Sequence, residues 1–293
     1  MIVVRLMGGL GNQLFQYAAG RALALKHKTE LQFDLSYLKA DPNPNYTKRN
    51  LELNLFDLRI TEVKPEDLEK FKSSSFIKKA LKKIFGNSFS NYFVANQSNF
   101  SFLSEFNSYP SNTYLNGYWQ SEKYFLNIRE ILLNELIIRK TKSNEVASAE
   151  NEISNSNSVS LHIRRGDYVS LKSASEHHGV MPLEYYYQAI DIIKKQNKEI
   201  TVFVFSDDIS WVRENLKLTD KCVYIDFNKG ENSVFDMYLM SLCKHNIIAN
   251  SSFSWWGAWM NQNPKKIVTA PKNWFVNKEI KTNDLIPDTW LKL

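Results

Sequence analysis

Apolar runs alternate with helix-like segments through the second half of the chain, and this alternation constrains the fold more than any other feature. The runs have the composition of buried strands, and the segments between them carry apolar residues at helical spacing. These runs span residues 159–163, 200–205, 222–226, 246–250 and 266–271. Because helices and strands alternate with short connections, we predict an α/β domain built on a parallel sheet.

The N-terminal part begins in the same way. Residues 1–7 have the composition of a buried strand, 8–12 form a glycine-rich turn, and 13–28 have the apolar spacing of a helix. A second strand is expected within 30–38. This strand, turn, helix and strand open another α/β sheet.

The fold class that follows is α/β, with two Rossmann-like domains facing a cleft and ligands at the carboxyl ends of the strands. Residues 143–158 are polar and low in complexity, and their second half, 153–158, is interpreted as the connector between the two domains. We therefore expect an N-terminal domain over 1–155 and a C-terminal domain over 156–293, and we allow for the last residues to pack back on the N-terminal domain.

Charge and cysteine content narrow the class of protein. The chain has 293 residues, a net charge of +6 and a pI near 9.0, which favour an acidic partner such as a nucleotide phosphate, a nucleic acid or an anionic membrane. Cys222 and Cys243 support neither a disulfide framework nor a zinc cluster, and the N-terminal apolar run is too short for a signal peptide, so we expect a cytoplasmic protein. Lysines and apolar residues share helical spacing over 76–85, which fits either an ordinary solvated face or a peripheral membrane contact.

The sequence HIRRGDY, residues 162–168, places two arginines where a buried strand ends. A guanidinium presents a planar fork that matches phosphate oxygens, so Arg164 or Arg165 is a candidate for neutralising a diphosphate leaving group. His162 and Asp167 belong to the same stretch. The alternative interpretation is an interdomain salt bridge between the arginines and Asp167.

Two further polar stretches follow predicted strands. Ser206, Asp207 and Asp208 come directly after 200–205, where one acid is expected to cap the next helix and the other is free for a ribose or guanine. No D-x-D metal pattern occurs, so no metal site is inferred. Asn250 ends a strand and is followed by a serine-rich helix start, a common phosphate site; plain N-capping, with the tryptophans as core, is the alternative. This start comprises Ser251, Ser252, Phe253 and Ser254.

The turn GGLGNQ, residues 8–13, partly matches a dinucleotide-binding fingerprint. Gly9 and Gly11 have the required spacing and Asp34 ends the next strand, but Leu14 stands where glycine or alanine is needed. A tight structural turn and a loop whose Asn12 and Gln13 amides touch a sugar are the other two interpretations. His177 and His178 are expected in a loop, with His178 as a candidate acceptor contact.

Four stretches together resemble the bacterial α-1,2-fucosyltransferases, in the order typical of that family. They are GGLGNQLFQYA at 8–18, HIRRGDY at 162–168, SDD at 206–208 and NSSFSWWGAW at 250–259. The resemblance implies a glycosyltransferase B-type fold with GDP-fucose bound by the C-terminal domain. It also implies inverting transfer of L-fucose to the 2-hydroxyl of a galactose-containing acceptor, without a required metal or other cofactor, in surface polysaccharide or O-antigen synthesis.

The resemblance places Arg164 at the donor pyrophosphate, supported by Arg165, His162, SDD and SSFS, but it carries over no acceptor residues. From the chemistry of the reaction, Asp167 is the acid nearest the arginines that could take the acceptor proton. Candidate donor contacts are His162, Arg165, Ser206, Asp207, Asp208, Asn250, Ser251, Ser252, Phe253, Ser254, Gly9, Gly11 and Asn12. Candidate acceptor contacts are Gln13, Asp34 and His178. The setting implied is the bacterial cytoplasm, with 76–85 against the inner membrane as one option.

Two other classes remain as alternatives. A nicotinamide-dependent oxidoreductase would use the GGLGNQ turn and Asp34, but it leaves HIRRGDY without a role. A nucleic-acid-binding protein needs clustered basic residues with exposed aromatic side chains, whereas the aromatic residues here fall mostly inside apolar runs. We therefore expect no nucleic-acid partner.

Overall fold

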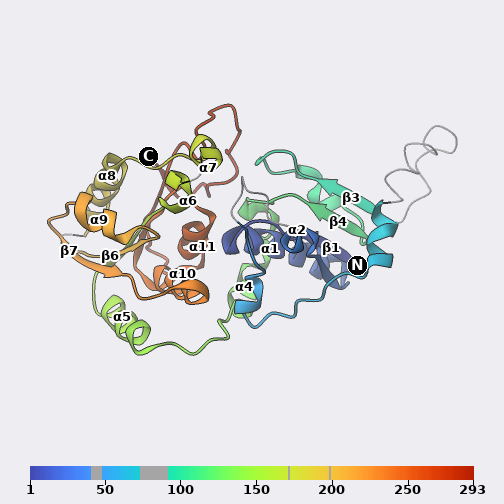
Figure 1. Cartoon of the computed structure of the whole chain (residues 1–293), viewed down its shortest axis with the longest axis horizontal. Helices are drawn as coiled ribbons and strands as arrows, with labels where there is room; N and C mark the ends of the chain where they lie inside the picture. Colours follow the sequence, from blue (N-terminus) through green and yellow to red (C-terminus); the bar gives the residue numbers. More distant parts are fainter. Residues whose placement is uncertain (41–47, 73–91, 171, 198) are drawn as a thin grey trace. The chain divides into compact units, whose positions relative to one another are not determined.

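The computed structural model describes residues 1–40, 48–72, 92–170, 172–197 and 199–293. Contacts group these residues into two units, each built on a parallel sheet (Figure 1). Of the described residues, unit 1 comprises 1–40, 48–72, 92–137 and 281–285, and unit 2 comprises 138–170, 172–197, 199–280 and 286–293. The prediction of two Rossmann-like α/β domains is confirmed. The stretch 76–85 lies outside the described residues.

Unit 1 contains a four-stranded sheet in the order β2-β1-β4-β3, in which every pair is parallel. Its elements are β1 (Ile2–Arg5), α1 (Leu10–His27), β2 (Leu31–Asp34), α2 (Ser36–Lys39), η1 (Leu53–Leu55), β3 (Phe93–Asn96), η2 (Ser104–Ser108), β4 (Thr113–Asn116), η3 (Glu122–Tyr124), η4 (Leu126–Ile128) and α4 (Arg129–Glu135). Residues 65–72 form a further helix.

Helix α1 packs directly on β1 and β2 because Gly20 brings the two backbones close. A Cβ at this position would lie 2.4 Å from Val4 Cγ2 and 2.8 Å from Leu31 Cδ1. Polar contacts also fasten the helix to α4, where Glu135 accepts hydrogen bonds from Tyr17 and Arg21. The opposite face of the sheet is covered by a second apolar cluster around Val3 and Phe71.

Unit 2 contains a six-stranded sheet in the order β10-β9-β8-β5-β6-β7, again parallel in every pair. Its elements are α5 (Asn144–Ser154), β5 (Ser158–Ile163), α6 (Gly166–Ser170), α7 (Lys172–His177), α8 (Leu183–Lys194), β6 (Thr201–Ser206), α9 (Ile209–Asn215), β7 (Lys221–Ile225), η5 (Gly230–Ser233), α10 (Val234–Leu242), β8 (His245–Ile247), α11 (Ser252–Met260), β9 (Val268–Ala270) and β10 (Leu291–Lys292). The five strands predicted after residue 158 are thus present, although β8 ends three residues earlier than expected at Ile247.

The central strand of unit 2 is buried along its whole length. Every residue of β5 is buried, and its apolar side chains pack with α8 and β6 in one cluster. Helices α10 and α11 lie side by side, where Gly257 faces Met240 so closely that an added Cβ would lie 2.8 Å from Met240 Cβ (Figure 1). This packing fixes the start of α11 relative to the sheet.

The polar stretch 143–158 is mostly helical, and the connector predicted at 153–158 runs from the end of α5 to the start of β5. Residues Asn144–Ser154 form helix α5, with Ser143 accepting the capping hydrogen bond from the N–H of Val146. Val146, Ala149 and Ile153 are buried, and the helix packs on α10 within unit 2. The contacts divide the units after Ile137, whereas the sequence predicted a division after residue 155. The sequence did not predict this helix because only three buried apolar residues, spaced over two turns, mark its packed side.

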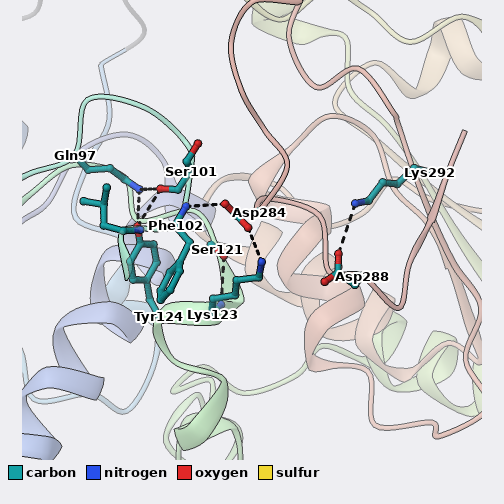
Figure 2. A network of polar contacts seen from close by, with 10 residues as sticks. Gln97, Ser101, Phe102, Ser121, Lys123, Tyr124, Asp284, Asp288 and Lys292 are labelled. Carbon is teal, nitrogen blue, oxygen red and sulfur yellow. Dashed lines mark hydrogen bonds and ion pairs between the residues drawn. The ribbon is translucent and has the colours of Figure 1, made fainter. Parts of the chain in front are cut away.

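Residues 281–285 return to unit 1, and Asp284 anchors them there. Its carboxylate accepts a hydrogen bond from the Phe102 N–H at 2.9 Å and pairs with Lys123 (Figure 2). Tyr124 supports the same region by donating to the Ser101 carbonyl while accepting from the N–H of Leu103. The final strand β10 belongs to unit 2, where it pairs with β9. The return to unit 1 is therefore seen for 281–285 and not for the last residues.

Among the described residues, no helix combines the length and the apolar composition that a membrane crossing requires.

We predict that Asp284→Ala lowers the free energy of unfolding of unit 1 by about 1 kcal/mol, because the partly buried Phe102 N–H and the Lys123 ammonium lose a charged acceptor. Limited proteolysis should then cut within 276–285 faster than in the wild type, and urea denaturation should report the loss. Asp288→Ala is the matched control, since Asp288 is largely exposed and lies 3.9 Å from Lys292 (Figure 2). Equal effects of the two substitutions would contradict the anchoring role.

Candidate active site

Three of the predicted polar stretches meet at the carboxyl edge of the sheet in unit 2. Strand β5 lies between β6 and β8, and Ile163 is paired with Ser206. The residues that follow these strands are therefore neighbours, although they are separated by about forty positions in the sequence. Open parallel sheets bind ligands at this edge. HIRRGDY, SDD and NSSFSWW thus lie at one edge of the sheet in unit 2.

Opposite charges pair across the ends of β5 and β6. Arg164 Nη1 lies 2.8 Å from Asp207 Oδ2, and Arg165 Nε lies 3.1 Å from Asp208 Oδ2. The backbone N–H of Arg165 also donates to Asp207 Oδ1 at 2.9 Å. Both arginines thus form ion pairs with acids from the end of β6 in the same unit, and the predicted pairing with Asp167 stays a prediction. The side chain of Asp167 lies outside what the structure describes.

Asp208 holds a second arginine contact in place. Its Oδ1 accepts from the N–H of Trp211 at 3.3 Å and caps α9, as predicted for one of the two acids. Its own N–H donates to Ser206 Oγ at 3.0 Å. The Arg165 guanidinium carbon lies 3.6 Å from the centre of the Trp211 ring, within the range of a cation–π contact. Arg165 is therefore clamped between a carboxylate and an indole.

Gly166 is the residue that allows this arrangement. A Cβ there would lie 2.4 Å from Asp207 Oδ2, a distance at which one group has to move. Glycine thus makes room for the carboxylate beside the two arginines. The RRG sequence is explained by this close approach.

His162 is buried directly below the arginines. Burial, and to a lesser extent repulsion by Arg164, lowers its pKa to about 3. Its Nδ1 is buried and meets no hydrogen-bond partner among the described residues. The ring lies 6.0 Å from that of Phe253 in α11, centre to centre. His162 is a neutral ring that links the end of β5 to the start of α11.

Asn250, which follows β8, ties two other backbone segments together. Its Nδ2 donates to the carbonyls of His178, Gly179 and Trp274 at 2.8–3.2 Å. Its Oδ1 is buried and has no partner among the residues that the structure describes. The predicted donor contact therefore has at least a positioning role within unit 2.

Tyr168 was missed as a site residue although it stands inside the HIRRGDY motif. Its hydroxyl donates to the Asn250 carbonyl at 3.1 Å, and its ring stacks on His178 with centres 4.6 Å apart and planes 4° apart. The Arg164 guanidinium lies 5.6 Å from the same ring. His178 thus joins the donor-side cluster of unit 2 rather than standing alone in a loop, and Tyr168 connects it to Arg164.

Helix α11 begins at this edge with an open N-terminus. Ser251 occupies the N-cap position, yet within the described residues its side chain makes no capping hydrogen bond. Ser254 Oγ donates to the Ser251 carbonyl at 3.3 Å, while Ser252 and Phe253 are half-buried. Because the first N–H groups of a helix have no intrahelical acceptor, this end favours an anion. The tryptophans are core residues, as the alternative held: Trp255, Trp256 and Trp259 are all buried.

Asp236 is a second residue that sequence reasoning missed. It stands in the first turn of α10, which follows β7 and so begins at the same edge of the sheet. Burial raises its pKa to about 7, despite a 2.7 Å hydrogen bond from Asn228 Nδ2 and the charge of Lys229. An acid within the apolar run VFDMYLM was the available signal, because a carboxyl group is rarely placed in such a run without a use.

The GGLGNQ turn lies in unit 1 and is shaped by internal contacts. Gly8 has a φ of +73°, which favours glycine, and Gly11 lies buried in the first turn of α1. Asn12 Oδ1 accepts from Gln120 Nε2 at 2.7 Å. Gln13 is fully buried: its Nε2 donates to the carbonyls of Gly8 and Asn50, and its Oε1 accepts from the N–H of Glu52. The Gln13 amide is thus engaged within unit 1 rather than at the surface.

Glu52 occupies the position that a dinucleotide would need. Its carboxylate accepts a hydrogen bond from the N–H of Leu10 at the start of α1, and its Oε2 would lie 3.6 Å from a Cβ at Gly9. Burial raises its pKa, against the effects of the Leu10 N–H and Arg49. A dinucleotide pyrophosphate binds at this helix end in Rossmann proteins. An acidic side chain already there argues against the oxidoreductase alternative.

Asp34 is buried and already engaged. It accepts hydrogen bonds from the Tyr114 hydroxyl at 2.6 Å and from the Ser36 N–H at 2.9 Å. Burial opposes its ionisation, but these donors and the nearby Arg5 outweigh burial and hold its pKa below the ordinary value. Asp34 is thus a charged residue at the end of β2 rather than an exposed contact.

No group of three or more His, Cys, Asp or Glu side chains that could hold a metal ion occurs in the described parts of the chain. Independence of a metal stays a prediction.

Comparisons with known proteins identify the family. The sequence model of glycosyl transferase family 11 matches residues 1–293. The chain belongs to glycosyl transferase family 11. This family 11 glycosyltransferase is 35% identical to the O-antigen biosynthesis glycosyltransferase WbnK of Escherichia coli, over 98% of this chain and 99% of the relative. It is also 35% identical to an alpha-1,2-colitosyltransferase of Escherichia coli, over 100% and 99% of the two chains.

The fold of the family 11 enzyme is shared with a solved plant protein. Arabidopsis thaliana FUT1, determined in complex with GDP, superposes with a TM-score of 0.51 and covers 98% of this chain and 74% of that one. The two sequences are 12% identical, so the likeness concerns the fold alone.

We predict that Gly166→Ala weakens GDP binding at least about 10-fold, because the new methyl group displaces the Asp207 carboxylate and with it both arginines. Calorimetric titration with GDP measures the effect. Gly230→Ala is the control within the same unit, since a Cβ there meets no atom within 4 Å and only its φ of +59° is unfavourable. Unchanged GDP affinity in Gly166→Ala would contradict the proposed crowding.

His162 makes stability depend on pH in a defined window. The folded pKa of about 3 is below the ordinary value, so between pH 7 and 4 the unfolded chain takes up a proton that the folded chain refuses. Stability from this group is complete above about pH 7 and falls as the pH falls. Lowering the pH from 7 to 5 lowers the free energy of unfolding of the wild type. We predict that the same pH change lowers that of His162→Phe by about 2 kcal/mol less. Urea denaturation at both pH values tests this, and identical losses would refute it.

Proposed function

We propose that this enzyme transfers L-fucose from GDP-β-L-fucose to the 2-hydroxyl of a terminal β-galactoside, with inversion, in O-antigen or surface polysaccharide synthesis. Membership of glycosyl transferase family 11 supports a sugar-transfer reaction, and the name of the WbnK relative supports the O-antigen setting. The observation that carries the donor assignment is the meeting of Arg164, Arg165 and the open start of α11 at one sheet edge. A cytoplasmic location at the inner face of the membrane is part of the proposal.

The charges at this edge suit a diphosphate leaving group. When the bond to fucose breaks, negative charge develops on the β-phosphate and positive character on the sugar ring. Arg164 and the N–H groups of α11 can stabilise the negative charge on the β-phosphate with little rearrangement, because Asp207 already orients the guanidinium. Preorganised donors of this kind contribute about 3 kcal/mol each to lowering a barrier.

His162 and Asp208 complete the donor site in this proposal. A neutral His162 adds no charge of its own beneath Arg164 and keeps the end of β5 in place. Asp208 holds Arg165 against Trp211. Asp236, with its raised pKa and position at the start of α10, is placed to receive a hydrogen-bonding edge of the base or ribose.

Removal of the acceptor proton is assigned to Asp167 as a prediction from the sequence. Because an oxocarbenium-like transition state lets the proton leave late, a strong base is not essential. Independence of a metal belongs to the same proposal, since the arginines and the helix start supply the positive charge that a cation would supply.

A second donor sugar has specific support. One relative with 35% identity over the whole chain is named as an alpha-1,2-colitosyltransferase, and colitose lacks the 3-hydroxyl of fucose. Parallel assays with GDP-fucose and GDP-colitose distinguish the two. A ratio of kcat/KM above about 10 in favour of either sugar decides between them.

We predict that Arg164→Lys lowers kcat about 100-fold or more while the fold is retained, because an ammonium cannot replace the bidentate fork. Initial rates with GDP-fucose and circular dichroism measure both effects. Arg213→Lys is the matched control: Arg213 also pairs with an acid, Asp226 at 2.9 Å, but lies on the surface of α9. Near-normal turnover of Arg164→Lys would contradict the proposed role of Arg164 at the diphosphate.

Calorimetric titration tests the nucleotide directly. GDP is expected to bind at micromolar concentration equally with and without EDTA, and NAD is expected not to bind. Binding of NAD in place of GDP would return the nucleotide site to the GGLGNQ turn. Loss of GDP binding in EDTA would overturn the metal independence.

A further inference from the structure

A row of polar side chains ends the sheet of unit 1. The last residues of its four strands are Asp34, Arg5, Asn116 and Asn96, in the spatial order β2-β1-β4-β3. Arg5 is paired in register with Asp34, and Asn96 with Asn116. We call these four residues the edge row. Four polar strand ends side by side are unusual for a sheet whose inner residues are apolar, and they lie where open parallel sheets bind ligands.

The edge row points away from helix α1. Val4 faces that helix at Gly20, and side chains alternate along a strand, so Val3 and Arg5 share the opposite face. Val3 there packs with Phe71, Val94 and Tyr114. The apolar cluster covers the part of the sheet nearer the amino ends of the strands, and the edge row continues the same face at the carboxyl ends.

Hydrogen bonds connect the members of the row without saturating them. Asn116 Nδ2 donates to Asn96 Oδ1 at 2.8 Å, and Arg5 Nη1 reaches Asn116 Oδ1 only at 3.5 Å. Arg5 Nε is buried and has no acceptor among the described residues. Asn96 is exposed, so its amide donors remain for a ligand.

An exposed aromatic ring stands beside the row. Tyr37, in α2, is 41% exposed, and the Arg5 guanidinium carbon lies 5.7 Å from the centre of its ring. A tyrosine ring offers a flat apolar surface with a polar tip, as sugar rings with one apolar face require. Planar amides beside an aromatic ring match the alternating hydroxyl and C–H surfaces of a pyranose.

The charges of the row balance. Asp34 is held ionised by Tyr114, Ser36 and Arg5, while Arg5 carries one positive charge. The asparagines are neutral. A row with no net charge favours a neutral ligand, because an anionic sugar would gain from Arg5 but be repelled by Asp34.

We propose that the edge row and Tyr37 form the subsite for a neutral pyranose of the acceptor glycan. The inference rests on the proposed function and adds the residues and the sugar class to it. Asn116, Asn96 and Arg5 hydrogen-bond the hydroxyls, and Tyr37 covers the apolar face of the sugar. Asp34 acts as a positioning residue that balances and orients Arg5, which differs from the direct acceptor contact predicted for it.

Acceptor kinetics test this subsite. Asn116→Ala and Tyr37→Ala should each raise the KM for lactose about 10-fold. The hydrolysis rate of GDP-fucose without acceptor and the affinity for GDP should stay as in the wild type, because Asn116 and Tyr37 are not among the residues proposed to bind GDP. Tyr37→Phe should keep most of the affinity. If Asn116→Ala fails to fold, the exposed Asn96→Ala tests the same row, with an expected rise in KM of about 3-fold or more.

Asn107→Ala is the control, since Asn107 is an exposed asparagine of unit 1 in η2. It should leave the KM for lactose unchanged. A wild-type KM for lactose in Asn96→Ala and Tyr37→Ala overturns the inference. It is equally overturned if the wild type prefers the anionic acceptor 3′-sialyllactose, or if neither lactose nor N-acetyllactosamine raises turnover above donor hydrolysis. Failure of the proposed function shows differently, as absence of both GDP binding and GDP-fucose hydrolysis.

Discussion

The paired charges at the ends of β5 and β6 are the interaction on which the rest of the site depends. Two arginines and two aspartates meet there, and all four side chains are at least half-buried, with exposed fractions of 15–39%. Breaking such a pair leaves an uncompensated charge and is costly, so the arginines are held in one orientation. Gly166 permits the pairing, and Asp208 extends it into the cap of α9. The strand order β8-β5-β6 then brings the open end of α11 to the same edge.

The carboxyl edge of unit 2 could be predicted from the sequence because each of its parts follows an apolar run. An apolar run predicts a buried strand, and polar residues directly after the run are therefore predicted to lie at the end of that strand. What the sequence did not reveal is which charges pair: Arg164 was expected against a ligand or Asp167, and the structure pairs it with Asp207. Contacts between residues 164 and 207 depend on strand order, which no local pattern encodes.

Unit 1 was harder to predict because its local sequence patterns are weak. Strands β3 and β4 are four residues long and end in asparagine, so neither shows a clear alternation of apolar and polar residues. Gln13 was expected at the surface as a polar residue in a glycine-rich turn, yet its amide is buried by three backbone contacts from residues 8, 50 and 52. Helix α5 was not predicted, because only three of its residues are buried and the rest of the helix is polar or exposed.

The pairing of Arg164 with Asp207 has a consequence for competition among anions in the cell. Asp207 Oδ2 engages Arg164 Nη1 at 2.8 Å, and the other N–H donors of the guanidinium face any incoming anion, which therefore shares Arg164 with a carboxylate. A metabolite that carries a single carboxylate gains little from a guanidinium whose charge is already balanced. A diphosphate gains more, because it brings two charges and also meets the N–H groups of α11. Asp207 thus favours anions of high charge density while it keeps the guanidinium oriented.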